Sequence, residues 1–396
     1  MDRRKFLQRS IEAVAGALIV PSAPAVAKDS AAVVASAPSF ARLDATSQAE
    51  LVAKGEVTPS ELLEDAIRRI ETLNPKINAL VLSLFDQART AARGPLPDGP
   101  FKGVPYAIKD EFDLKGTRRT AGSRLLANNI STETSPIVAR SIAAGFLVLG
   151  KTNMPEFGLN ATTESIFLGA CRNPWNLEHS SGGSSGGTAA AVASGMLPIA
   201  SAADGGGSIR IPASCCGVFG FKPSRGRMVG SGDDPGQIGV DHAISRSVRD
   251  SAILFAWNER HDANARLPAI GLISSPSSAR RTIGLSTKDV HGLEPTAPVK
   301  AEIERTAQHC RTLGHRVEEA TLPVDGHELM RNFIALWGHE GDRIVSLAKS
   351  MGVRPHGVLE PWTLYLSKHF GSQPSQAMPA ALGYFAELSR RFDDFF

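Results

Sequence analysis

Two glycine-rich loops, separated by one helix and one strand, constrain this chain more than any other feature of its sequence. The first loop is GGSSGG at 182–187, and the second is DGGGS at 204–208. Between them, an alanine-rich run over 188–195 predicts a short helix ended by a glycine, and 197–203 predicts a small apolar strand. One rigid helix–strand unit would therefore hold two serine-bearing loops in a fixed relation.

Glycines on both sides of a serine have a physical use. Glycine adopts positive φ and lets other backbone approach closely. A run of glycines also aims several N–H groups into one concavity, which suits an anion or a developing oxyanion. A flexible linker is the alternative interpretation, but apolar segments follow each loop directly. The pattern therefore favours two fixed loops.

Four segments give the chain a family resemblance. They are GVPYAIKDEFD at 103–113, GGSSGG at 182–187, DGGGSIRIPA at 204–213 and GVFGFKP at 217–223. Together they resemble the amidase signature family of serine amidases, and the resemblance extends from about residue 43 to about residue 323. The segments CRNPWNLEHSSGGSSGG and DGGGSIRIPASCCG look most like the branch that contains the 6-aminohexanoate-cyclic-dimer hydrolases.

The resemblance implies a catalytic triad that contains no histidine. A serine hydroxyl needs a base, because its own pKa is far too high for attack at pH 7. In this family the base is a lysine, linked to the nucleophile through a second serine that is held on a cis peptide. These roles fall on Ser208 as nucleophile, Ser184 as relay and Lys109 as base. The N–H groups that would bind the oxyanion belong to the second loop: Gly205, Gly206, Gly207 and Ser208.

The residues around these positions agree with such a site. Lys109 ends an apolar strand candidate over 103–109, so burial would favour the neutral amine that a base requires. Strand alternation sends Asp110 to the other side. Asp204 is expected to fix the second loop by hydrogen bonds, and Arg210 to pair with a loop carboxylate. Taken singly, these residue types have plainer interpretations, namely a surface lysine, a turn serine and a helix N-cap; only their joint occurrence favours catalysis.

Strand and helix signals alternate along the chain, which predicts an α/β fold. We expect a mixed, largely parallel sheet flanked by helices, within one amidase domain over 43–396. The clearest alternations lie in two places, and each consists of a strand, a helix and a second strand. These are 103–109, 135–144 and 146–149, and then 282–285, 298–313 and 315–320.

The C-terminal stretch departs from the family pattern. Members of the family generally continue past a helix like that at 382–396 into further sheet strands and a closing helix. The resemblance therefore implies that the amidase domain is C-terminally incomplete. A truncated, catalytically weak or inactive amidase homologue is an alternative that follows from this expectation.

The N-terminus resembles an export signal. Arg3-Arg4-Lys5 resembles a twin-arginine motif, an apolar run follows over 13–20, and Ala25-Val26-Ala27 fits a small-x-small cleavage site. The run is too short to span a bilayer permanently. We therefore predict a signal peptide over 1–27, a disordered Ala/Ser-rich linker over 28–42, and a periplasmic or exported protein.

Composition argues against several partners. Lys and Arg number 43 against 40 Asp and Glu, and no basic tract is interleaved with aromatic residues, so nucleic-acid binding has no support. The four cysteines show no metal-ligand spacing, and no metal or cofactor is expected. The expected partner is a small-molecule amide, whether linear, cyclic or aryl, and a homodimer stays open.

Two other motifs overlap the first loop. Residues 182–186 fit the G-x-S-x-G nucleophile elbow of α/β-hydrolases, which would use a Ser-His-Asp triad with a late histidine such as His315 or His339. That elbow needs a buried strand directly before it, whereas Asn173-Pro-Trp-Asn176 indicates a loop. Residues 182–188 also fit a phosphate loop that lacks its lysine. The sequence therefore favours a serine amidase that acts through an acyl-enzyme.

Overall fold

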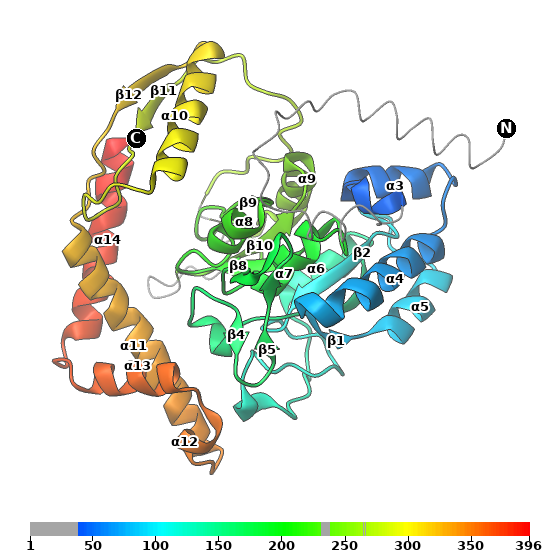
Figure 1. Ribbon diagram of the computed structural model, residues 1–396, viewed down its shortest axis with the longest axis horizontal. Coiled ribbons are helices and arrows are strands. Elements are labelled where there is room, and N and C mark those ends of the chain that lie inside the picture. The colour runs from blue at the N-terminus through cyan, green and yellow to red at the C-terminus, as the bar shows by residue number, and fades with distance from the viewer. Residues whose placement is uncertain (1–38, 231–237, 264, 266) are drawn as a thin grey trace.

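The computed structural model describes residues 39–230, 238–263, 265 and 267–396 (Figure 1). The predicted signal peptide and most of the predicted linker lie outside the described residues. The last four linker residues form a 3-10 helix, η1 (Ser39–Arg42), so ordered structure begins slightly earlier than predicted. No helix in the described part of the chain is long and apolar enough to cross a membrane.

Two three-stranded sheets form the centre of the molecule, in the orders β1–β3–β2 and β8–β10–β9. The first sheet contains β1 (Leu80–Ser83), β2 (Pro105–Lys109) and β3 (Leu147–Thr152). The second contains β8 (Ile199–Asp204), β9 (Phe219–Gly220) and β10 (Val240–Ser245). Strands β2 and β8 lie beside each other, where the Lys109 N–H donates to Ser201 Oγ at 2.7 Å.

Strand direction differs in part from the prediction. The α/β class and the mixed sheet are confirmed, and β2 pairs with β3 in parallel. Strand β1 is antiparallel to β3, however, and β10 is antiparallel to both β8 and β9. The expectation of a largely parallel sheet therefore fails for these central pairs. Alternating helix and strand signals show where strands lie but not which way they run; a parallel pair needs a crossover such as the helix between β2 and β3.

Helices cover the central strands (Figure 1). They are α3 (Ala45–Ala53), α4 (Pro59–Ile77), α5 (Phe85–Arg93), α6 (Pro136–Ala143), α7 (Gly186–Ala193), α8 (Arg210–Cys216) and α9 (Val248–Asn258). Helix α7 is almost entirely buried, which its glycines and alanines permit because they need little space between packed elements. It leads into β8, so the predicted helix–strand unit between the two loops is confirmed.

The segments between these helices and strands contain several short elements. The 3-10 helices are η2 (Arg124–Leu126) and η3 (Glu156–Gly158). Two small antiparallel ribbons pair β4 (Glu164–Ser165) with β5 (Gly169–Ala170), and β6 (Arg172–Asn173) with β7 (Asn176–Ser180). Strand β7 leads directly into the first glycine-rich loop.

The C-terminal part lies along one side of the centre in Figure 1. Strands β11 (Thr282–Leu285) and β12 (Arg316–Glu319) are parallel and flank α10 (Ala297–Thr312), which confirms the predicted strand–helix–strand unit. The remaining helices are α11 (Gly326–Ser350), α12 (Pro355–Val358), α13 (Pro361–Gly371) and α14 (Ala377–Phe395). Helix α11 packs against α13 and α14, and its Trp337 donates from Nε1 to the Leu159 carbonyl at 3.1 Å.

Candidate active site

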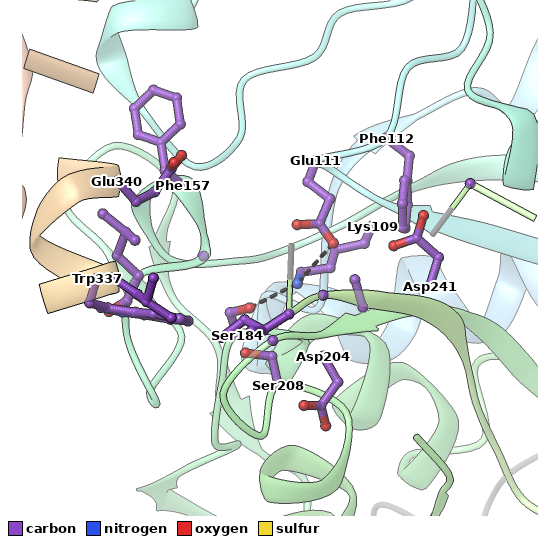
Figure 2. A pocket seen from close by; sticks show the side chains of 18 of the residues that line it. Lys109, Glu111, Phe112, Phe157, Ser184, Asp204, Ser208, Asp241, Trp337 and Glu340 are labelled. Atoms are coloured by element: carbon purple, nitrogen blue, oxygen red, sulfur yellow. Dashed lines mark hydrogen bonds and ion pairs between the residues drawn. The ribbon is translucent and has the colours of Figure 1, made fainter. Parts of the chain in front are cut away.

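The lysine at the end of β2 faces a serine of the first glycine-rich loop. Lys109 is 1% exposed, because β2 lies between β3 and β8 in the middle of the sheet layer. Its Nζ donates to Ser184 Oγ at 2.8 Å. The same nitrogen lies 3.0 Å from Oε1 of Glu111, and Figure 2 shows the two partners on opposite sides of it. A buried amine thus lies between a hydroxyl and a carboxylate.

Close backbone packing holds the first loop. The peptide between Gly183 and Ser184 is cis, as the resemblance implied for the relay serine. A Cβ on Gly183 would stand 2.7 Å from backbone atoms of Thr162, so only glycine fits there. The Thr163 hydroxyl donates to the Gly182 carbonyl at 2.9 Å and accepts from the Gly186 N–H at 3.1 Å. The chain at 162–163 therefore fixes the position of this loop.

One carboxylate organises the second loop. Asp204 is fully buried and accepts hydrogen bonds from the N–H groups of Gly207 and Ile209, at 2.8 and 3.1 Å, and from Nε and Nη2 of Arg210, both at 2.9 Å. Burial alone would raise the pKa of Asp204, but the hydrogen bonds from Arg210 and the loop outweigh it and hold that pKa below its usual value. The predicted roles of Asp204 and Arg210 within the loop are confirmed.

Only part of the predicted set of oxyanion donors is available. The Gly207 N–H is directed to the Asp204 carboxylate, so the expectation that it would face an oxyanion is wrong. Its φ of +123° turns the peptide in this direction. Within the described residues, none accepts a hydrogen bond from the N–H of Gly205, Gly206 or Ser208. These three groups remain as candidate donors.

The three residues of the predicted triad line a single cavity of about 470 Å³. Ser208 is 9% exposed and lies beside Ser184 in Figure 2. The Ser185 N–H donates to the Ser208 carbonyl at 3.2 Å, which ties the two loops together. Lys109 and Ser184 are 75 positions apart in the sequence, and both line the same cavity as the second loop.

Comparison with known proteins identifies the family. The family model named Amidase matches residues 61–369. The chain belongs to the amidase family. It is 40% identical over 294 residues to the 6-aminohexanoate-cyclic-dimer hydrolase of Paenarthrobacter ureafaciens, covering 70% of this chain and 59% of that protein.

Solved structures of two amidases share the fold. The 6-aminohexanoate cyclic dimer hydrolase in complex with its substrate has a TM-score of 0.79 and 33% identity, over 89% of this chain and 77% of that one. A bacterial aryl acylamidase of the amidase signature family has a TM-score of 0.79 and 27% identity, over 89% and 78% of the two chains. The predicted family and its predicted branch are therefore confirmed, and the chain is an enzyme that hydrolyses carbon–nitrogen bonds.

Three residues at the cavity of this amidase were missed by the sequence analysis: Glu111, Asp241 and Trp337. Glu111 lies two positions after Lys109, so the alternation that removed Asp110 from the lysine's side would have placed Glu111 on it. Asp241 comes from β10 and Trp337 from α11, and nothing near either residue in the sequence signals the site. Burial raises the pKa of Asp241 to about 7; the nearby Glu111 adds to this rise and Lys109 opposes it.

Asp110 turns away from Lys109, as predicted. Its carboxylate accepts hydrogen bonds from the N–H of Thr120, at 3.1 Å, and from the Thr120 hydroxyl. Behind it, the fully buried Lys151 of β3 donates from Nζ to the Phe112 carbonyl at 3.0 Å, and burial lowers the pKa of Lys151 to about 8. This second lysine holds the turn after β2 and lies outside the cavity lining.

The alternative with a histidine base finds no geometric support. Strand β7, which precedes the first loop, is exposed and pairs with the short β6, so the loop is no elbow on a buried strand. In the described part of the chain, no histidine forms a hydrogen bond with Ser184 or Ser208; His339 lines the cavity, but its ring packs against Phe370. No group of three or more metal-binding side chains occurs among the described residues either.

Proposed function

We propose that this amidase hydrolyses the amide bond of a small carboxamide, linear, cyclic or aryl, through an acyl-enzyme on Ser208. The observation that carries the proposal is the hydrogen bond from Lys109 Nζ to Ser184 Oγ, 2.8 Å long, at a cavity that Ser208 also lines. This arrangement gives a serine nucleophile a path to a buried amine without a histidine.

In the first half of the reaction, Ser208 Oγ attacks the amide carbonyl carbon. Its proton passes to Ser184 Oγ while the Ser184 proton passes to the neutral amine of Lys109. The carbonyl oxygen becomes an oxyanion, and the N–H groups of Gly205, Gly206 and Ser208 are the donors for it. The carbon–nitrogen bond then breaks, and the leaving amine takes a proton from the lysine through Ser184.

In the second half, water attacks the Ser208 ester. The same path carries the water proton to Lys109, and the lysine returns a proton to Ser208 Oγ as the carboxylic acid leaves. Atoms and protons balance over the cycle, since one water and one amide yield one acid and one amine. Lys109 therefore acts as base and acid in turn.

The cavity supports a small substrate with an apolar body. Its volume of about 470 Å³ lies in the range of small-molecule sites. Phe112, Phe157 and Trp337 contribute aromatic surface to its lining. The relatives that act on a cyclic amide and on aryl acylamides are consistent with such a substrate.

A fluorophosphonate probe tests this proposal without knowledge of the substrate. We expect one adduct, mapped by mass spectrometry to Ser208, and expect labelling to fall by at least about a hundredfold in Lys109→Ala, as loss of a general base does. An adduct on Ser184, or undiminished labelling of Lys109→Ala, would contradict the proposal. A panel of linear, cyclic and aryl amides then identifies the substrate class.

We also propose that the protein is exported to the periplasm. The support is the Arg3-Arg4 pair ahead of a short apolar run and the Ala25-Val26-Ala27 sequence. Protein recovered from the periplasm should begin near Lys28, and a variant with Arg3→Lys and Arg4→Lys should accumulate uncleaved in the cytoplasm. Cytoplasmic protein that keeps Met1 irrespective of this double substitution would count against export.

A further inference from the structure

The catalytic lysine has a second partner that the proposed mechanism does not yet use. Glu111 Oε1 lies 3.0 Å from Lys109 Nζ, opposite the Ser184 hydroxyl (Figure 2). The Glu111 side chain is 25% exposed, whereas that of Lys109 is 1% exposed. Its backbone is fixed as well, because Arg119 Nε donates to the Glu111 carbonyl at 2.7 Å. The carboxylate is therefore held against the lysine from the turn that follows β2.

Burial and this carboxylate act on Lys109 in opposite directions. Removal from water favours the neutral amine, and an anion within about 4 Å favours the ammonium ion. A base of this kind needs both forms, since it must be neutral before Ser208 attacks and positively charged afterwards. The carboxylate thus opposes the resting base but stabilises the charge that forms during attack.

We propose that Glu111 is a positioning residue that aims Lys109 Nζ at Ser184 and stabilises the ammonium ion formed as Ser208 attacks. This inference rests on the proposed function. The division of labour is that of a serine protease, in which a buried carboxylate orients the base and stabilises its protonated form without taking the proton itself. Here the carboxylate comes from the same strand end as the base.

Other charges face this pair from neighbouring elements. Asp241 approaches from β10 and interacts electrostatically with both Lys109 and Glu111, and Arg119 comes from the loop after β2. From α11, Glu340 reaches the cavity, but its carboxylate is paired with Arg343 at 2.6 Å. Among these groups, Glu111 forms an ion pair with the lysine, with its Oε1 3.0 Å from Lys109 Nζ.

The direction of the pH effect follows from this geometry. In Glu111→Gln the amide keeps the size of the side chain but removes the anion that lies 3.0 Å from Lys109 Nζ, and a buried amine without a nearby anion is more readily neutral. The rising limb of reactivity against pH should move down by about one pH unit. The plateau should fall by about 10- to 100-fold, because the ammonium ion formed during attack loses its support.

The experiment measures the second-order rate constant of fluorophosphonate labelling from pH 5 to pH 9.5. It compares the full chain with Glu111→Gln, Glu111→Asp and the control Glu340→Gln, which removes a carboxylate from the same cavity. Each variant is also made with Asp241→Asn, because burial raises the pKa of Asp241 to about 7 and its ionisation would overlap the rising limb. We expect the limb to move in Glu111→Gln alone, and Glu111→Asp to keep the limb with a lower plateau.

Two results would overturn the inference. A lower plateau without movement of the limb in Glu111→Gln would mean a merely structural role, and an unchanged profile would mean no role. If Glu111→Gln does not fold, Glu111→Asp decides the question, because that variant keeps the negative charge. A shift of its rising limb down by as much as one pH unit would contradict the inference. Failure of the proposed function is distinguishable, since it appears as an adduct away from Ser208 or as undiminished labelling of Lys109→Ala.

Discussion

The two glycine-rich loops meet at one cavity but are held there by different means. In the 182–187 loop, Gly183 and Gly187 lie against backbone, and Gly186 lies against the side chains of Thr163 and Ser181. A Cβ on Gly183 would stand 2.7 Å from backbone atoms of Thr162, and a Cβ on Gly187 would clash with the backbone of Asn153 and Ala79. The backbone beside Gly183 and Gly187 cannot move aside cheaply. This loop is therefore fixed by its own packing.

The 204–208 loop faces side chains instead. A Cβ on Gly205 would meet the Trp337 ring at 3.6 Å, an ordinary contact. What fixes this loop is the Asp204 carboxylate, which binds two N–H groups of the loop and its C-terminal flank as well as the Arg210 guanidinium. The loop thus faces the cavity on one side and is held by the Asp204 carboxylate on the other.

The difference matches the role that we propose for each serine. A relay has to keep one distance to a lysine, so a loop wedged between backbone segments suits Ser184. A nucleophile has to face substrate with free N–H groups beside it, so a loop tied from one side suits Ser208. Substitutions of the two serines should therefore lower activity, whereas substitutions of the groups that hold each loop should lower stability.

The largest expected effect distinguishes the two hydroxyls. Ser208→Ala removes the nucleophile and should lower kcat/KM by about 10⁴-fold or more and abolish fluorophosphonate labelling. Ser184→Ala should slow labelling strongly but leave the adduct on Ser208. The measurement is labelling rate with mass mapping of each variant. Labelling that survives Ser208→Ala but vanishes in Ser184→Ala would reverse the comparison.

The next effect concerns stability. Gly183→Ala forces a methyl group against the Thr162 backbone, which cannot yield without moving the loop. We expect a loss of about 3 kcal/mol in the free energy of unfolding, measured by urea denaturation. A change below about 0.5 kcal/mol would show that backbone packing does not fix this loop.

A smaller effect is expected at the carboxylate behind the second loop. Asp204→Asn keeps the shape of the side chain but loses its charge, and the variant should lose about 2 kcal/mol of stability at pH 7. Because the folded-state pKa of Asp204 is lowered, its contribution is present above the ordinary pKa of 3.8 and is lost as the pH falls through the folded-state pKa. Urea denaturation at pH 7 and near pH 2.5 measures this. Equal gaps between variant and wild type at both pH values would contradict the assignment.

The sequence predicted what depends on neighbours along the chain. The β2 strand ending at Lys109 and the α7–β8 unit between the loops follow from local apolar patterns and glycine stops. The direction of Asp110 followed from alternation, and the same rule would have found Glu111. These elements need no knowledge of the fold.

What the sequence did not predict depends on contacts between distant segments. Asp241 and Trp337 reach the cavity because β10 and α11 pack there, and no local pattern marks either residue. The engagement of the Gly207 N–H by Asp204 depends on how one loop folds back on itself. Strand directions depend likewise on how the chain returns to the sheet. The meeting of Lys109, Ser184 and Ser208 at one cavity could be predicted because a long family motif carries information on contacts that local patterns do not reveal.

The smallest expected effect is at Gly205, and it tests the comparison most directly. Its φ lies outside the left-handed region, and an added Cβ would find Trp337 at 3.6 Å and Ile238 at 3.8 Å, both at ordinary contact distance. Gly205→Ala should therefore raise stability by about 0.5 kcal/mol, since alanine restricts the unfolded chain. The matched pair Gly183→Ala and Gly205→Ala places the same methyl group on each loop, and urea denaturation measures the free energy of unfolding of both variants. A loss at Gly205 as large as that at Gly183 would mean that packing, and not the Asp204 carboxylate, holds the second loop as well.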